Sequence, residues 1–113
     1  MSNYIARGSF PIEINEGIPR TVTFVVPDAI VMTSRKAKIQ VRKNTNTAPI
    51  ITIDTDGGAI VKNLQRLICS FSAADSIGHG GKYEWDLIVY TDTTDGIKIG
   101  KGATNIIPRI TRL

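Results

Sequence analysis

Hydrophobic and polar residues alternate with a period of two along much of this chain, most clearly over residues 82–90. There Tyr83, Trp85, Leu87 and Val89 fall on one side, and charged residues fill the first positions between them. Successive side chains of a strand point to opposite faces, so this pattern predicts a half-buried β-strand with its aromatic residues inward. Trp85 is the single tryptophan of the chain, and we expect it to mark the centre of the core together with Tyr83 and Leu87.

Other segments alternate in the same way and are separated by residues that favour turns. They cover residues 9–14, 20–26, 35–42, 50–53, 59–62, 66–71 and 97–107. The Asp56-Gly57 pair predicts a tight hairpin between two of these segments, because Asp-Gly accepts the positive φ angles of a type I′ turn. At most one short helical turn is expected, near residues 72–77, where Ser72 is a suitable N-cap and Asp75 occupies the capping-box position.

Several short strands with almost no helix predict an all-β fold, an antiparallel two-sheet β-sandwich, with a small closed barrel as the alternative. The 113 residues suit a single domain over residues 1–113, with an N-terminal arm at about 1–8 and a C-terminal arm at about 104–113. No apolar stretch reaches the roughly 18 residues needed to cross a bilayer, so no membrane contact is expected. The first residues lack the apolar core of a signal peptide, which favours synthesis in a cytoplasm.

Both ends of the chain are rich in apolar residues, although terminal segments usually fray. The residues in question are Tyr4, Ile5, Phe10, Ile12, Ile106, Ile107, Ile110 and Leu113. Small modules often join larger assemblies by adding a strand to a neighbour, so one hypothesis is that these arms bind sister subunits or a larger protein. The alternative is that both ends complete the sheets of their own domain.

The net charge of +4 and the isoelectric point near 9.5 raise the question of nucleic-acid binding. The densest group of cations comprises Arg35, Lys36, Lys38, Arg42 and Lys43. Such a stripe could contact phosphates, but single-strand binders place aromatic residues on the same face, and none is interleaved in this segment. The alternative is a solvated face whose lysines oppose Glu84 and Asp86 on a neighbouring strand. Nucleic acid is therefore the less favoured partner.

The residue types that carry catalysis or bind metals are sparse. Cys69, the single cysteine, has the spacing of an inward strand residue and is expected to be an inert buried thiol. His79, the single histidine, lies between two glycines, which do not hold a catalytic base rigidly. Counting from Asp54, an EF-hand loop would need glutamate where Gln65 stands, and no phosphate-binding glycine motif is present. We predict no catalytic, metal or cofactor site, and we do not expect an enzyme.

Five segments carry a family resemblance in their order along the chain. They are Ala37-Lys38-Ile39-Gln40-Val41-Arg42, Asp56-Gly57-Gly58-Ala59-Ile60, Ser72-Ala73-Ala74-Asp75, Gly81-Lys82-Tyr83-Glu84-Trp85-Asp86-Leu87 and Gly100-Lys101-Gly102. Together they resemble the small immunoglobulin-like domains of tailed-phage virion proteins. The type concerned is the N-terminal domain of siphophage baseplate upper proteins and of tail-fibre attachment domains. The resemblance covers about residues 20–112.

This resemblance implies an immunoglobulin-like fold, a structural role without catalysis, and frequent trimeric assembly with sister subunits and other virion proteins. We therefore expect a small adaptor in the baseplate, tail-fibre or neck region of a virion. Because the sequence ends where such domains normally continue into a shaft or receptor-binding module, we expect either a stand-alone adaptor or a small decoration subunit. A capsid decoration or head-fibre subunit is the alternative within this class. A basic nucleic-acid-binding β-barrel is the alternative from another class.

Overall fold

The computed structural model describes residues 2–5, 11–91 and 95–108, with residues 2–5 described by their backbone. Within these residues the chain forms nine strands and one short helix. The elements are β1 (Ser2–Ile5), β2 (Ile12–Asn15), β3 (Arg20–Val25), β4 (Lys36–Arg42), β5 (Pro49–Asp54), β6 (Ile60–Asn63), β7 (Arg66–Phe71), α1 (Ala73–Ser76), β8 (Gly81–Tyr90) and β9 (Ile97–Ile107).

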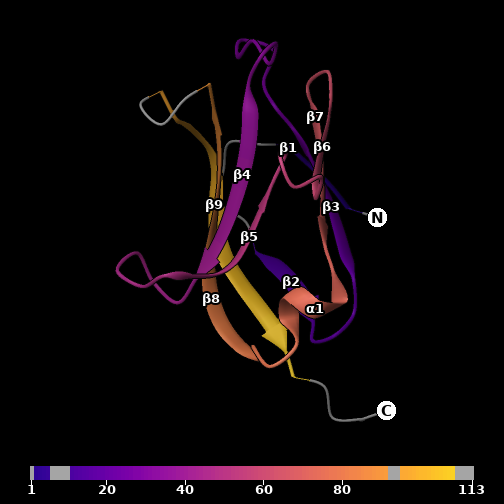
Figure 1. The fold of residues 1–113 in the computed structure, drawn as a ribbon, viewed down its shortest axis with the longest axis vertical. Coiled ribbons are helices and arrows are strands. Elements are labelled where there is room, and N and C mark those ends of the chain that lie inside the picture. The colour runs from indigo at the N-terminus through magenta and orange to yellow at the C-terminus, as the bar shows by residue number, and fades with distance from the viewer. Residues whose placement is uncertain (1, 6–10, 92–94, 109–113) are drawn as a thin grey trace.

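The strands form two sheets that pack face to face (Figure 1). One sheet has four strands in the order β1-β3-β7-β6, and the other has five in the order β2-β9-β8-β4-β5. Most neighbouring strands are antiparallel, whereas β1 pairs with β3 and β2 pairs with β9 in parallel. The predicted two-sheet sandwich is confirmed, and the closed-barrel alternative is wrong for the described residues because they form two separate sheets.

The strand order is that of an immunoglobulin-like domain. The sequence β1-β3-β7-β6 corresponds to strands A, B, E and D, and β9-β8-β4-β5 corresponds to strands G, F, C and C′ of a variable-type sheet. Two landmarks of antibody domains are absent from their usual places. The tryptophan lies on β8 instead of the C strand, and Cys69 is a free cysteine on β7, so no disulfide joins the sheets.

The core lies between the two sheets and is filled by inward residues from both. Trp85 is 2% exposed and meets Phe24 of the facing sheet with ring centroids 5.5 Å apart and a tilt of 53° between the rings. A tilted pair of this kind is a favourable aromatic arrangement. Leu87 and Val89 are fully buried beside Trp85, whereas Tyr83 is partly buried and packs against the rim of the core. The period-two pattern thus places the inward face of β8 as expected.

Hydrogen bonds join α1 and the residues after it to the turn between β2 and β3. The carboxylate of Asp75 accepts the backbone N–H of Ser72 at 2.8 Å, as the capping-box pattern predicts. The buried hydroxyl of Ser76 accepts the N–H of Gly17 at 2.8 Å, and Glu16 accepts the N–H of Gly78 at the same distance. The short helix is therefore held against the turn that joins β2 of one sheet to β3 of the other. No helix in the described parts of the chain is long and apolar enough to cross a membrane.

The hairpin expected at Asp56-Gly57 is wrong. Strand β5 belongs to the five-stranded sheet and β6 to the four-stranded sheet, so this turn carries the chain from one sheet to the other. Asp54 accepts the N–H of Gly57 at 2.7 Å, which makes the turn longer than a two-residue loop, and Gly58 takes the positive φ of 85°. The two-residue hairpin lies instead between β6 and β7, where Leu64 has φ of 57°.

Candidate interaction surfaces

The apolar ends of the chain are partly used within the domain itself. Ile12 is 1% exposed and Ile106 is completely buried, because β2 pairs with β9 and both strands face the core. The hypothesis that these two residues are assembly contacts is corrected by their burial. Ile107 is 38% exposed at the end of β9. The expected C-terminal arm therefore begins inside a strand, because residues 104–107 belong to β9.

The backbone of the N-terminal segment also pairs with a strand of its own domain. Residues 2–5 form β1, which adds to the four-stranded sheet of the same chain by pairing with residues 22–25 of β3. The register places Tyr4 beside Phe24 and Ile5 beside Val25. This pairing corresponds to the alternative in which an end of the chain completes its own sheet. Phe10, Ile110 and Leu113 lie outside the described residues.

The basic face contains cations that are already engaged with groups of the same domain. Lys36 forms an ion pair with Asp56, with Nζ and Oδ2 3.2 Å apart. Arg42 donates to the carbonyl oxygen of Thr47 at 3.1 Å and to the side-chain oxygen of Gln40. Lys43, at the end of the strand, places its ammonium 5.3 Å from the ring centroid of Tyr83, within the range of a cation–π contact.

The register between β4 and β8 differs from the expected pairing of charges. Lys38 lies opposite Ile88 and Lys36 opposite Tyr90, so the expectation that the lysines oppose Glu84 and Asp86 is wrong. Arg42 is the cation that lies opposite Glu84. The register also brings an aromatic residue onto this face, because the ammonium of Lys38 lies 5.6 Å from the ring centroid of Tyr90. The sequence of β4 itself contains no aromatic residue. Tyr90 belongs to β8, about 50 residues further along the chain, so the sequence of β4 did not reveal this contact.

Charges of both signs cover the outer face of the five-stranded sheet. The charged residues at its outward positions are Glu13, Lys36, Lys38, Arg42, Asp54, Lys82, Glu84, Asp86, Lys98 and Lys101. Asp86 is 3.9 Å from Lys98, and a hollow of about 140 Å³ is lined by Arg42 and Lys101 together with both acids of β8. The cations therefore do not form a continuous positive stripe, which weakens the case for phosphate binding.

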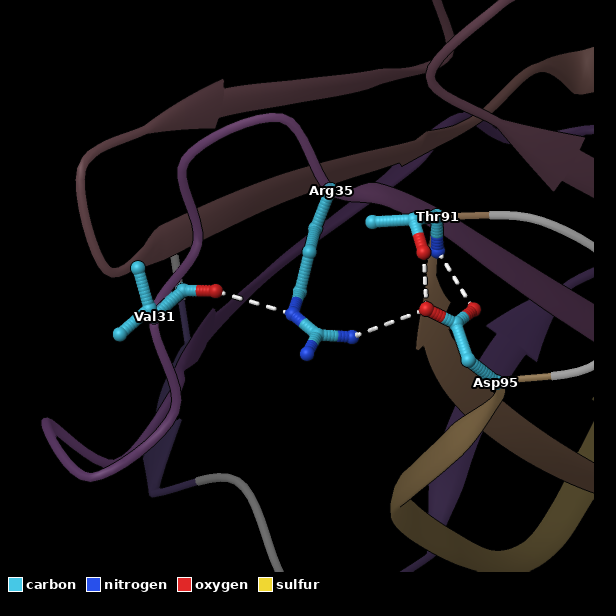
Figure 2. Close-up of polar contacts among 4 residues, drawn as sticks. All are labelled: Val31, Arg35, Thr91 and Asp95. Carbon is cyan, nitrogen blue, oxygen red and sulfur yellow. Dashed lines mark hydrogen bonds and ion pairs between the residues drawn. The ribbon is translucent and has the colours of Figure 1, made fainter.

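Arg35 joins two loops through its guanidinium group (Figure 2). Its Nε donates to the carbonyl oxygen of Val31 at 2.9 Å, and its Nη1 is 3.9 Å from a carboxylate oxygen of Asp95. Asp95 also accepts the backbone N–H of Thr91 at 2.7 Å and the hydroxyl of the same residue. The guanidinium thus connects the segment before β4 to the turn that follows β8.

The residues considered for catalysis or metal binding are held in structural positions. Cys69 is fully buried, and desolvation by burial raises the pKa of its thiol to about 12. Ser70 is exposed on the opposite face of β7, so the two neighbours do not share a site. His79 lies in the loop after α1, where its backbone N–H donates to the carbonyl oxygen of Ser76. No group of three or more histidine, cysteine or carboxylate side chains gathers within residues 11–91 and 95–108.

Sequence reasoning missed a surface at the end of the sandwich where the β6–β7 turn lies. Leu64 lies in that turn and is 84% exposed. Val31 lies in the connection between β3 and β4 and is 67% exposed. The two residues line the same hollow, which has a volume of about 450 Å³. A second hollow of about 430 Å³ is also lined by Leu64, together with Val25 and Arg66 among others. The available signal was a leucine at a turn position that glycine or asparagine usually occupies.

This surface continues onto the outer face of the four-stranded sheet. Val61 is 54% exposed and lies directly opposite Ile68 on the neighbouring strand. The described outward positions of β3, β6 and β7 are Thr21, Thr23, Val25, Val61, Asn63, Arg66, Ile68 and Ser70, with one charged residue among them. We name the group of Val25, Val31, Val61, Leu64 and Ile68 the tip surface. Its composition contrasts with the charged outer face of the other sheet.

No family model and no curated protein matches the sequence of this chain. Solved structures do match, and they include the extracellular domains 3–5 of Drosophila OTK, with a TM-score of 0.37 and 19% sequence identity. That alignment covers 91% of this chain and 34% of the other, so the chain spans about a third of the length of that structure.

Proposed function

We propose that this protein is a structural component of a tailed-phage particle, an adaptor in the baseplate, tail-fibre or neck region that docks other proteins and catalyses no reaction. The virion assignment is supported by the ordered set of segments that resembles immunoglobulin-like virion domains. The docking role is supported by one observation in particular. Leu64 and Val31, the most exposed of the described large apolar side chains, line the same hollow.

The chemistry of the remaining surface favours docking over catalysis. The carboxylates of Asp54 and Asp75 accept backbone N–H groups in a turn and at a helix start, and that of Asp56 is paired with Lys36. Such groups stabilise the fold and are not arranged around a common point where a substrate could react. Contiguous exposed apolar surface, in contrast, marks protein–protein contacts in soluble domains. The fold itself does not decide between these roles, because one fold carries many functions.

The location of the protein on purified particles tests this proposal. Gold-labelled antibodies raised against the purified protein would be applied to intact particles of the virus that encodes it and viewed by electron microscopy. Antibodies pre-absorbed with the same protein are the matched control. We expect label at the tail tip, the fibre roots or the neck.

Label confined to the head would replace the adaptor with the capsid decoration or head-fibre alternative. Absence of label from particles, while the protein is abundant in infected cells, would contradict a virion role altogether. In that case retention of the purified protein on DNA or RNA at low salt would decide for the nucleic-acid-binding alternative.

A further inference from the structure

We propose that the open edge of β5 binds an extended, acidic segment of another protein, which adds to the five-stranded sheet as a sixth strand. β5 is the last strand in the order β2-β9-β8-β4-β5, and no described strand pairs with its outer side. Partners bind to such edges because main-chain hydrogen bonds supply affinity. This inference gives a partner chemistry for the docking role proposed above and rests on it.

The hydrogen bonds between β4 and β5 leave backbone groups of β5 pointing out of the sheet. The N–H of Thr55 donates to the carbonyl oxygen of Ala37 at 3.1 Å, and these two residues continue the β4–β5 register by one pair. Bonded and non-bonded pairs alternate along an antiparallel ladder. Ile53 therefore bonds to β4, whereas Thr52 and Asp54 direct their N–H and C=O groups to the open side. An incoming strand needs backbone groups with this spacing.

β5 has few of the features that prevent edge strands from pairing with other chains. Edges are commonly protected by short length, lysines, internal prolines or bulges. β5 has six residues, and residues 50–53 are Ile-Ile-Thr-Ile, which are uncharged and have high β propensity. Pro49 is its first residue, and the shift of register lies beside it at Arg42. The other edge strands, β1, β2 and β6, have four residues each, so β5 is the described edge best suited to accept a strand.

The side chains of β5 leave room for a neighbouring strand. Ile51 and Ile53 are 3% and 5% exposed, so they anchor β5 in the core. Thr52 lies between them on the outer face and is exposed. A strand added about 4.8 Å from β5 would continue both faces, with side chains beside the two isoleucines on one face and beside Thr52 on the other.

The charges around β5 favour an acidic partner. Residues 36–62 comprise β4, β5, β6 and their connections, and their charged residues are Lys36, Lys38, Arg42, Lys43, Lys62, Asp54 and Asp56. Lys36 pairs with Asp56. Lys38 lies opposite Asp54. The other three cations have no matching acid among these residues, so acidic side chains of a partner would complement this edge.

The same charges disfavour a second copy of this chain as the occupant. A copy that paired through β5 would bring the same five cations and two acids to the contact, and the whole chain has a net charge of +4. Glu84 of β8 lies opposite Arg42, on the side of β4 away from the edge. Cations still outnumber acids on the outer face of the sheet, because Lys82, Lys98 and Lys101 also lie there.

A titration followed by nuclear magnetic resonance tests the proposal. The probes are two capped peptides of about ten residues, the length of a long strand, one alternating threonine with glutamate and the other threonine with lysine. The proteins are the wild type, Thr52→Pro and the control Thr52→Val. Proline removes the outward N–H without removing a bond to β4, whereas valine keeps both the N–H and the branched shape.

We expect the glutamate peptide to shift the amide resonances of Thr52 and Asp54 and to bind the wild type and Thr52→Val with affinities within about twofold of each other. It should bind Thr52→Pro at least about tenfold more weakly, because the new ladder loses a hydrogen bond and proline disturbs its neighbours. The lysine peptide should bind the wild type at least about tenfold more weakly, because its charges have the same sign as the excess at this edge.

Absence of shifts with the glutamate peptide up to about 1 mM would overturn the proposal. Equal binding to Thr52→Pro would also overturn it, because that result indicates attraction to the cations without strand pairing. Equal binding of both peptides would contradict an acidic partner. Shifts of the same amides with protein concentration alone would assign the edge to a second copy.

Hydrogen exchange of the wild type supplies a readout that does not depend on the folding of Thr52→Pro. With the glutamate peptide bound, the amides of Thr52 and Asp54 should exchange at least about tenfold more slowly, and unchanged rates would overturn the proposal.

These outcomes are separate from those of the particle-labelling experiment. A peptide that fails to bind, while particles are labelled, would remove the β5 edge from the docking role and leave that role intact. A peptide that binds, while particles are never labelled, would leave the edge contact intact and contradict the virion role.

Discussion

The side chain of Gln65 provides the most quantitative test of how this end of the sandwich is held. Its amide nitrogen lies 3.2, 3.0 and 3.0 Å from the carbonyl oxygens of Val26, Pro27 and Ile30. The amide has two hydrogens for three acceptors, so it makes about two full hydrogen bonds, one of them shared. Methionine has a similar length and no donor. The change Gln65→Met therefore removes these bonds while keeping the volume of the side chain.

The expected loss of stability follows from that count. A net contribution of about 1 kcal/mol per hydrogen bond gives about 2 kcal/mol, and carbonyl groups left without a donor raise this to about 3 kcal/mol. For a domain of 113 residues, a loss of 2 kcal/mol corresponds to a fall in Tm of roughly 6–12 °C. Urea denaturation followed by tryptophan fluorescence measures the free energy of unfolding, because Trp85 is the single tryptophan and is buried.

The matched control is Gln40→Met on the outer face of β4. The side-chain oxygen of Gln40 accepts a hydrogen bond from Arg42 on a partly exposed surface, so its loss should change the free energy of unfolding by less than about 0.5 kcal/mol. A Gln65→Met variant that is as stable as this control would refute the inference that the Gln65 amide stabilises the connection over residues 26–31.

Four further predictions concern Leu64, Ser76 and Cys69. Leu64→Asn should raise the free energy of unfolding by about 0.5–1 kcal/mol in urea titrations at low protein concentration, because it relieves the unfavourable backbone conformation; a destabilised variant would contradict this. Ser76→Ala should lower the free energy of unfolding by about 1–3 kcal/mol in thermal melts, because the N–H of Gly17 loses its acceptor, whereas the exposed Ser70→Ala should have little effect. Cys69 should resist a thiol reagent until the protein unfolds, and rapid reaction of the folded protein would show that it is accessible. Burial raises the pKa of this thiol from 9.0 to about 12, so the folded state favours the neutral form. Its stabilising effect should be complete below about pH 9 and decline as the pH rises toward 12, as denaturation at a series of pH values would show.

The local pattern of the sequence was sufficient to predict some elements of the fold and insufficient to predict others. The alternation around Trp85 predicted the inward face of β8, and the Ser72–Asp75 spacing predicted the helical turn, because both depend on near neighbours in the chain. The Asp56-Gly57 turn was misassigned because alternation does not reveal which sheet a strand joins. Strands β5 and β6 are adjacent in sequence, but they pair with β4 and β7 respectively.

Predicting the interaction surfaces required knowledge of the tertiary structure to a greater degree. The cations of β4 were visible in the sequence, but Tyr90 and Asp56, which lie against Lys38 and Lys36, come from other elements. Alternation could not show whether Ile12 and Ile106 pair within the chain or with a neighbour. Leu64 carried a local signal, because it stands in a turn, but its importance depends on Val31, which lies more than 30 residues earlier and is exposed beside it.

A reconstruction of the purified particle by electron cryo-microscopy tests the central claim most directly, because it reports both location and contacts. We predict density for this nine-stranded sandwich in the tail, fibre or neck region, with the β6–β7 turn at Leu64 buried against another protein chain. A particle that lacks the domain, or one in which the domain is present with Leu64 exposed to solvent, would contradict the account.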